Sequence, residues 1–318
     1  MAVYVLKKGD LEKFLLFLGK QGELIAPVKK DEVRFEPLKD PTDLYLDEQT
    51  YIPAKQYFFP QEQVLFTFQD DMIIPVVAPI KKRIFFGLRR CDLAAIQHQD
   101  IAFGEHNDPH YKKLRKSTIL IGYQCTKKLH HWCFCGSMDL PDFYDLMFFE
   151  QEHHYQIDVG SAQGETLLKK SKLCRKTVVR ISKEQKIVPD TNLLQRKDLG
   201  KHYSSKAWDS LVKKCISCAA CTTLCPTCYC HEIKDDVPVS LKEVQRKRTW
   251  SSCQLKEFSG VAGNYTFRES RSSRFKHRIF HQLQYFREKH GVDLCVGCGR
   301  CIKHCPPRID FIKVINKL

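Results

Sequence analysis

The apolar residues in the first two thirds of the chain fall into short runs separated by polar segments. Apolar runs of about 4–8 residues that are bounded by polar residues or glycine predict β-strands. Between residues 83–88 and 117–122, the segment DLAAIQHQDIAF (92–103) has a helical composition. A strand, a helix and a strand in this order predict a βαβ unit, and hence a parallel sheet. We expect strands at residues 23–28, 83–88, 117–122, 146–149 and 177–181.

A helix is expected close to the start of the chain. Asp10 is a suitable N-cap, and the apolar residues from Leu11 to Leu18 recur with helical spacing on one face. Gly19 follows the last of them and is expected to end the helix.

Length and composition predict a globular protein. The chain has 318 residues, 43% of them hydrophobic, which is enough for one large domain or two ordinary ones with a proper core. No apolar stretch approaches the roughly 18–20 residues needed to cross a bilayer. The first residues do not resemble an export signal. We therefore expect a soluble, cytoplasmic protein that does not contact a membrane.

Cysteine is unusually common, at sixteen residues. In a short secreted chain this number would indicate a disulfide framework. A long chain without an export signal is expected to keep its thiols reduced, so metal ligation is the better interpretation.

Two segments, residues 215–226 and 295–306, share the pattern C-x2-C-x2-C-x3-C-P. Three thiolates at three-residue spacing hold three corners of a 4Fe-4S cubane, and the fourth, before proline, ligates the other cluster in two-cluster ferredoxins. The pattern assigns one cluster to Cys215, Cys218, Cys221 and Cys305, and a second to Cys295, Cys298, Cys301 and Cys225.

Structural zinc is the alternative for these motifs. Zinc sites usually combine two close ligand pairs separated by a longer loop, whereas here three cysteines cluster and the fourth precedes proline. The repeated pattern favours iron–sulfur clusters, and two neighbouring clusters predict a one-electron relay.

The motifs divide the chain into two expected parts, giving an α+β fold class. Residues 1–205 are predicted to form an α/β domain with a mixed or parallel sheet, and residues 206–318 a two-cluster ferredoxin-like domain. The second part carries an insertion at about 231–290. Residues 241–290 of it hold twelve Lys or Arg against four Asp or Glu. This basic segment is either a docking face for an acidic partner or a nucleotide-binding subunit, or a solvated surface that also balances cluster charge.

The formal charge of +15 raises the question of nucleic acid. A 4Fe-4S cluster with four thiolates carries about −2 when oxidised, so bound clusters offset part of this charge. No recognisable nucleic-acid reader motif is present. Nucleic acid is therefore the less favoured partner.

A third cluster is predicted at the edge of the expected sheet. Cys91 and Cys125 each follow an expected strand, and the carboxyl ends of parallel strands are where open α/β folds place ligands. Cys133 and Cys135, in the segment HHWCFCG, follow in the next loop, and these four thiols could converge. The alternative is that Cys91 and Cys125 are small buried apolar residues.

Three further cysteines are not used by these assignments: Cys228, Cys230 and Cys253. With His231 they could bind another metal centre. The alternative, which we favour from the sequence, is that they pack beside the clusters as small polarisable residues.

Several segments together resemble one protein family. They are CISCAACTTLCPTCYC, RKRTWSSC, CVGCGRCIKHCP, IPAKQYFFPQEQVLFTF, RRCDLAAIQHQD, CFCGSM, GVAGNYTFR and SRFKHR. The chain resembles the beta subunit of cytosolic sulfhydrogenases, which are nickel–iron hydrogenases, and also the iron–sulfur subunit of anaerobic sulfite reductase. The family pattern includes positions matching Cys91, Cys125, Cys133 and Cys135, and also Cys228, Cys230 and Cys253; Cys174 lies outside it.

The resemblance implies an electron-transfer subunit without catalytic residues of its own. Such a subunit passes electrons between a flavin subunit that handles NAD(P)H and the catalytic subunits of a hydrogenase or a sulfite reductase, of which we favour the hydrogenase. The residues agree, because the sequence contains neither G-x-G-x-x-G after a strand nor a phosphate-binding G-x-x-x-x-G-K-[ST] motif. The other functions considered are a nucleic-acid-binding iron–sulfur protein and an enzyme whose third cluster has an open iron site.

Overall fold

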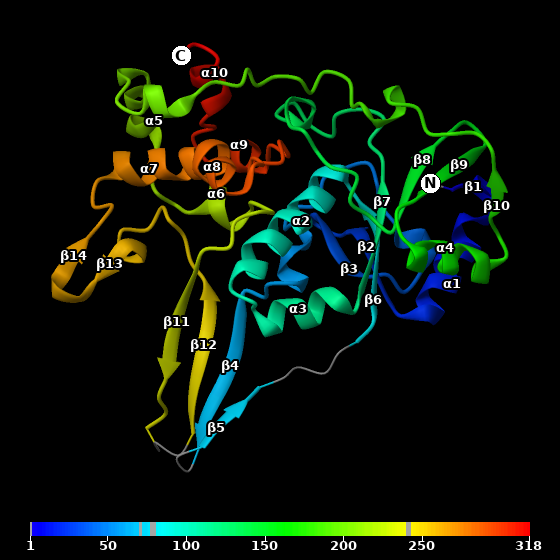
Figure 1. Ribbon diagram of the computed structural model, residues 1–318, viewed down its shortest axis with the longest axis horizontal. Coiled ribbons are helices and arrows are strands. Elements are labelled where there is room, and N and C mark those ends of the chain that lie inside the picture. Colours follow the sequence, from blue (N-terminus) through cyan, green and yellow to red (C-terminus); the bar gives the residue numbers. More distant parts are fainter. Residues whose placement is uncertain (1, 70–71, 77–80, 240–242) are drawn as a thin grey trace.

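An eight-stranded mixed sheet forms the centre of the amino-terminal part (Figure 1). The computed structural model describes residues 2–69, 72–76, 81–239 and 243–318. The strand order is β10-β1-β9-β8-β7-β6-β2-β3. These strands are β1 (Val3–Lys7), β2 (Glu23–Lys29), β3 (Val33–Pro37), β6 (Arg83–Leu88), β7 (Thr118–Tyr123), β8 (Leu146–Glu150), β9 (His154–Val159) and β10 (Arg175–Thr177).

The middle of this sheet is parallel and its two sides are antiparallel. Strands β2, β6, β7 and β8 pair in parallel, with Arg83 opposite Thr118 between β6 and β7. Helix α2 (Arg90–Glu105), followed by α3 (Pro109–Lys116), connects β6 to β7. The expected βαβ unit and the mixed sheet are therefore confirmed.

Helices cover both faces of the sheet. Ile84 and Phe86 of β6 point to the face covered by α1 (Leu11–Gln21) and α4 (Ala162–Ser171). Phe85, between them, packs on the opposite face with residues of α2. This alternation is the two-residue period of a strand, and it makes the amino-terminal part a three-layer structure with an apolar core on each side.

Two details of the sequence expectations are wrong. Helix α1 continues through Gly19 to Gln21, because a single glycine weakens a helix without ending it when the apolar face is buried. The strand expected at residues 177–181 ends at its first residue, and Val178 is 97% exposed. Its apolar residues have no neighbouring strand or core to cover them.

A second sheet joins the two parts of the chain. Its order is β11-β12-β4-β5, and it extends away from the rest of the molecule (Figure 1). Strands β4 (Glu62–Gln69) and β5 (Met72–Pro75) come from the amino-terminal part, whereas β11 (His231–Asp236) and β12 (Val244–Trp250) belong to the expected insertion. Residues 240–242 of that insertion lie outside the described residues.

Short helices and loops make up the remaining carboxy-terminal part. Trp208, Phe280 and Ile302 are almost fully buried in its core. Its helices are α5 (Asp209–Lys214), α6 (Ala220–Thr223), α7 (Arg271–Phe280), α8 (Phe286–His290), α9 (Arg300–Lys303) and α10 (Phe311–Ile315), with a small hairpin of β13 (Gly260–Val261) and β14 (Tyr265–Thr266).

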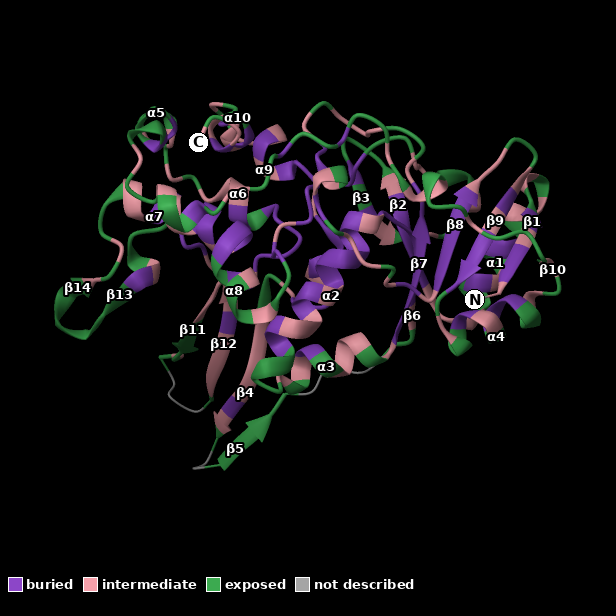
Figure 2. Cartoon of the chain, turned by 45° about the horizontal axis from the view of Figure 1, so that its top comes forward, coloured by how far each residue is buried: buried purple, intermediate pink, exposed green. Residues whose placement is uncertain are grey.

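Helix α2 lies between the large sheet and the carboxy-terminal part, and it is buried along most of its length (Figure 2). The Gln99 side chain donates to the carbonyl oxygen of Pro226 at 3.1 Å, and His98 Nδ1 lies 3.2 Å from the carbonyl oxygen of Leu294. A helix that is covered on all sides holds its two neighbours in a fixed relation. Within the described residues, no helix combines the length and the apolar character required to cross a membrane.

Candidate metal centres

The two cysteine motifs have the same backbone conformation. Ser217 and Ala219 of the first motif have positive φ values of 55° and 64°, and the equivalent Gly297 and Gly299 of the second have 65° and 70°. Each motif then enters a one-turn helix, α6 or α9, and the two helices pack together. A non-glycine residue with positive φ is uncommon, so finding it at two equivalent points indicates that the loop shape is required.

The fourth cysteine of the second motif lies with the first motif. Burial raises the pKa of the Cys305 thiol, and the nearby Cys218 and Cys215 raise it further. Burial likewise raises the pKa of Cys221 to about 11, with Cys215 and Cys305 among the contributing neighbours. One cavity is lined by the four cysteines of the proposed first cluster: Cys215, Cys218, Cys221 and Cys305.

The fourth cysteine of the first motif lies with the second motif. Cys225 is one of the charged neighbours that, after burial, raise the pKa of Cys295 and Cys301. Cys298, whose pKa burial raises to about 11, has Cys225 as a neighbour as well. The fold thus brings together both sets of thiols that the crossed pattern predicts, and donor sets of four thiols fit 4Fe-4S clusters.

The four cysteines of the predicted third site also come together. Cys91 lies in the first turn of α2, and Cys125 follows the end of the parallel strand β7. Burial raises the pKa of Cys135 to about 12, and the nearest thiols that contribute are Cys125 and Cys133. Cys135 is in turn one of the charged neighbours of Cys91. The phenyl ring of the intervening Phe134 is fully buried.

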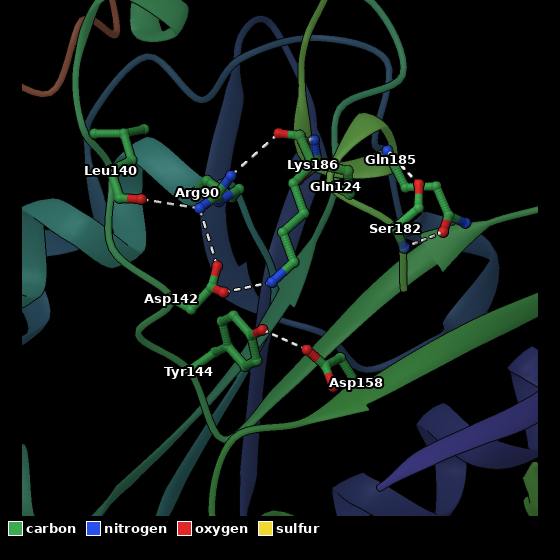
Figure 3. A network of polar contacts seen from close by, with 9 residues as sticks. All are labelled: Arg90, Gln124, Leu140, Asp142, Tyr144, Asp158, Ser182, Gln185 and Lys186. Atoms are coloured by element: carbon green, nitrogen blue, oxygen red, sulfur yellow. Dashed lines mark hydrogen bonds and ion pairs between the residues drawn. The ribbon is translucent and has the colours of Figure 1, made fainter. Parts of the chain in front are cut away.

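A polar network fixes the residues next to Cys91 and Cys125 (Figure 3). Arg90 and Gln124, which directly precede these cysteines, both donate to the carbonyl oxygen of Lys186 at 3.1 Å. Arg90 also contacts Asp142 and the Leu140 carbonyl oxygen, both at 2.9 Å. Because one carbonyl oxygen accepts from both loops, the network holds the two cysteines at the same edge of the sheet.

The third site lies directly against the second motif. The backbone N–H of Phe134 donates to the carbonyl oxygen of Gly297 at 2.8 Å, and Cys91 packs with Cys298 in one buried cluster. A Cβ atom on Gly297 would lie 2.6 Å from the Cα of Cys135. Electrons reaching the second cluster would therefore have the third site as a close neighbour.

No three Cys, His, Asp or Glu side chains, among those the structure describes, are close enough together to hold a single metal ion. A cubane spreads its four thiolates over the corners of a larger body, so the looser spacing is compatible with clusters. The cavity at the first motif, lined by its thiols and by apolar side chains such as Phe275 and Ile279, has the donors and the shape for such a group.

Buried cations near the thiols were not identified from the sequence as part of a site. Arg300 is 0% exposed, lies 3.0 Å from the Asp92 carboxylate and has Cys298 and Cys91 as neighbours. Arg278 and Lys55 are buried beside Cys225 and Cys228. The signal that could have found them is the position of Lys55 and Arg278 inside the segments IPAKQYFF and SRFKHR, which the family resemblance had already singled out.

Much of the basic insertion is paired within the molecule. Arg246 forms an ion pair with Asp235 at 2.7 Å, and Lys247 forms one with Asp236 at 2.7 Å. Arg248 is buried against Asp108 of the amino-terminal part. These contacts favour the charge-balancing interpretation of this segment over that of a free docking face.

Comparison with known proteins gives two further findings. The 4Fe-4S dicluster domain family matches residues 214–309, which include both motifs. The chain is 30% identical to sulfhydrogenase 2 subunit beta of Pyrococcus furiosus over 325 aligned positions, covering 96% of this chain and 95% of that protein. The chain belongs to the sulfhydrogenase beta-subunit family. No solved structure matches it.

Membership in the sulfhydrogenase beta-subunit family confirms the resemblance seen in the sequence. With a dicluster domain, this family member is an iron–sulfur protein of electron transport that binds 4Fe-4S clusters. The large sheet and helix α2 of this sulfhydrogenase-type subunit lie outside the matched domain, and they position the predicted third site.

Proposed function

We propose that this chain is the iron–sulfur electron-transfer subunit of a nickel–iron hydrogenase complex of the sulfhydrogenase type. The observation that carries the proposal is the exchange of fourth cysteines between the two motifs. Cys305 lies with the first motif and Cys225 with the second, so the two clusters would be adjacent. Adjacent clusters with solvent excluded by an apolar core are suited to passing single electrons.

The proposed ligands follow from the groups of thiols described above. The first cluster is held by Cys215, Cys218, Cys221 and Cys305, and the second by Cys295, Cys298, Cys301 and Cys225. The third is held by Cys91, Cys125, Cys133 and Cys135. The contact between Cys91 and Cys298 supports an order in which the second cluster is the middle one.

The proposed partners are the hydrogenase catalytic subunits and a flavin-containing NAD(P)H-oxidoreductase subunit. The similarity to a protein named sulfhydrogenase 2 subunit beta supports the hydrogenase over the sulfite reductase alternative. We place the complex in the cytoplasm, because all sixteen cysteines are free thiols, which a reducing compartment maintains.

The proposal is tested by purifying the native complex without oxygen and identifying its companion proteins. Hydrogen and NAD(P)H are then each supplied to the complex, and reduction of the clusters is followed by EPR. We expect both donors to reduce them. A chain that purifies alone and turns over a substrate by itself would overturn the proposal.

Iron counting tests the three ligand groups. Three cubanes predict about twelve irons per chain and two predict about eight. Cys125→Ser is expected to remove about four irons, whereas Cys174→Ser, outside all three groups, is expected to remove none. An unchanged iron content in Cys125→Ser would reduce the proposal to two clusters.

A further inference from the structure

The three cysteines outside the proposed clusters gather at the base of the β11–β12 hairpin. Cys230 directly precedes β11, and Cys253 follows the end of β12. The backbone N–H of Cys253 donates to the Cys230 thiol, and the two thiols also interact with each other. Cys228 is 6% exposed and Cys253 is 3% exposed. The hairpin therefore closes on a group of buried thiols that lies beside, and not within, the two motifs.

A buried arginine faces this group. Arg278 of α7 is 9% exposed and donates to the carbonyl oxygen of Cys221 at 3.0 Å. Its Nε has no hydrogen-bond partner. Among the thiols that stabilise its charge, Cys228 contributes most, followed by Cys225. In the part of the chain that the structure describes, Arg278 forms no ion pair with a carboxylate.

A buried lysine reaches the same group from the other part of the chain. Lys55 is 3% exposed, and its Nζ donates to the carbonyl oxygens of Cys228 at 3.1 Å and Thr222 at 3.3 Å. It lies 4.1 Å from the ring centroid of Trp250, the last residue of β12. Within the described ranges it likewise has no carboxylate partner. Cys228 is again the thiol that most favours its charged form, against the larger effect of burial.

Two buried cations without carboxylates require negative charge nearby. An unpaired buried charge costs several kcal/mol, and arginine does not lose its proton in proteins. Neutral thiols that only fill space would not supply that charge, whereas thiolates bound to iron would. Cys228 is the first neighbour of both cations, and it belongs to neither motif's set of four.

We propose that Cys228, Cys230 and Cys253 bind a further iron–sulfur cluster at the base of the hairpin. Lys55 and Arg278 supply its counter-charges. Three cysteines leave one iron of a cubane to a donor that is not a cysteine of this chain. Cys225, next to Cys228, would place this cluster beside the second one. The inference adds a site to the proposed relay and does not depend on the relay's partners.

Cys253→Ser is the main test, because this residue is far in the sequence from both motifs. We expect it to remove about four irons and one EPR signal while the signals of the motif clusters remain. Cys174→Ser is the matched control and should keep the full iron content. Full iron content in Cys253→Ser would overturn the proposal.

Lys55→Met gives a second test that leaves every thiol in place. Removing a positive charge beside a cluster favours its oxidised form, so the midpoint potential of one cluster should fall while the iron count is unchanged. The measurement is repeated in a Cys298→Ser background, which removes the neighbouring second cluster. If Cys253→Ser loses all its clusters, an unchanged set of midpoint potentials in this double variant overturns the proposal.

Failure of the hairpin cluster and failure of the proposed function are distinguishable. Cys218→Ser and Cys298→Ser interrupt the clusters of the two motifs and test the relay directly. A chain that keeps reduction by hydrogen and has no iron at Cys253 supports the relay alone.

Discussion

Gly299 shows at the scale of a single residue how tightly the second motif packs on the loop of the predicted third site. Its φ is +70°, and a Cβ atom there would lie 2.2 Å from the carbonyl oxygen of Trp132. Backbone atoms cannot move aside as the end of a long side chain can. Any side chain at this position would therefore separate the motif from the loop.

We predict that Gly299→Ala destabilises the protein and lowers its iron content. The left-handed conformation alone costs about 1–2 kcal/mol for a residue with a Cβ atom, and the clash adds to this. Gly263 is a matched control, because its φ is +79° and nothing lies within 4 Å of an added Cβ. Thermal unfolding of both variants separates the two effects. Equal losses in both variants would show that the clash with Trp132 does not matter.

The β11–β12 hairpin shows at the scale of an element how the two parts of the chain are held together. Arg248 of β12 is 4% exposed at its side chain and pairs with Asp108, the N-cap of α3. Its guanidinium lies 5.1 Å from the ring centroid of Phe59. A buried ion pair between a hairpin and a helix cap fixes the hairpin against the large sheet's helix layer.

We predict that Arg248→Met destabilises the protein by about 3–5 kcal/mol, because it leaves the Asp108 carboxylate without its partner. Hydrogen exchange should accelerate in β11 and β12 and stay slow in β6 and β7. The double variant Arg248→Met/Asp108→Asn should recover part of the loss, since the uncompensated charge is then gone. No recovery would mean that packing, not charge, makes the contribution.

Helix α7 carries a second element-scale prediction, concerning pH. Burial lowers the pKa of His277 to about 4, and Arg268 and His281 lower it further. In the unfolded chain the pKa is about 6.5, so the unfolded state takes up a proton that the folded state does not. Stability is therefore expected to fall as the pH decreases from about 6.5 towards 4.

Thermal midpoints at about pH 7.5 and about pH 5.5 check this expectation. His277→Gln should show a smaller difference between the two, whereas the same change at the exposed His153 should leave the difference as in the wild type. The remaining slope is expected from His281, whose pKa burial also lowers to about 4. A wild-type slope in His277→Gln would contradict the prediction.

At the scale of the whole molecule, the two parts depend on clusters to different degrees. The core under α1 and α4 is built from aliphatic and aromatic side chains, whereas the core of the carboxy-terminal part includes Cys215, Cys295, Cys301 and Cys305. Metal binding to thiolates that are brought together only by folding contributes directly to folding free energy.

We predict that removing iron unfolds residues 206–318 before the eight-stranded sheet. Limited proteolysis of the iron-free protein should cut first in the carboxy-terminal part, and far-UV circular dichroism should retain the signal of the sheet. The untreated protein is the control. Simultaneous loss of both parts would show that helix α2, buried between them, makes the chain a single cooperative unit.

The sequence determined the local features. The strand at 83–88, the helix after it and the parallel strand at 118–123 could be predicted, because each apolar run is bounded by polar residues. The two cysteine motifs could also be predicted, since a cubane requires that spacing within one loop. The strand at 177–181 could not, because nothing in its own residues shows that no neighbour covers it.

Only the tertiary structure decided which distant residues meet. It placed β4 and β5 beside β12, packed Cys91 against Cys298, and brought Lys55 and Arg278 to Cys228 from opposite sides of the chain. These contacts depend on burial and on charge in a medium of low polarity, which arise only when segments far apart in sequence exclude water together. Spacing within a motif reports on one loop, and the environment of a cluster comes from the whole fold.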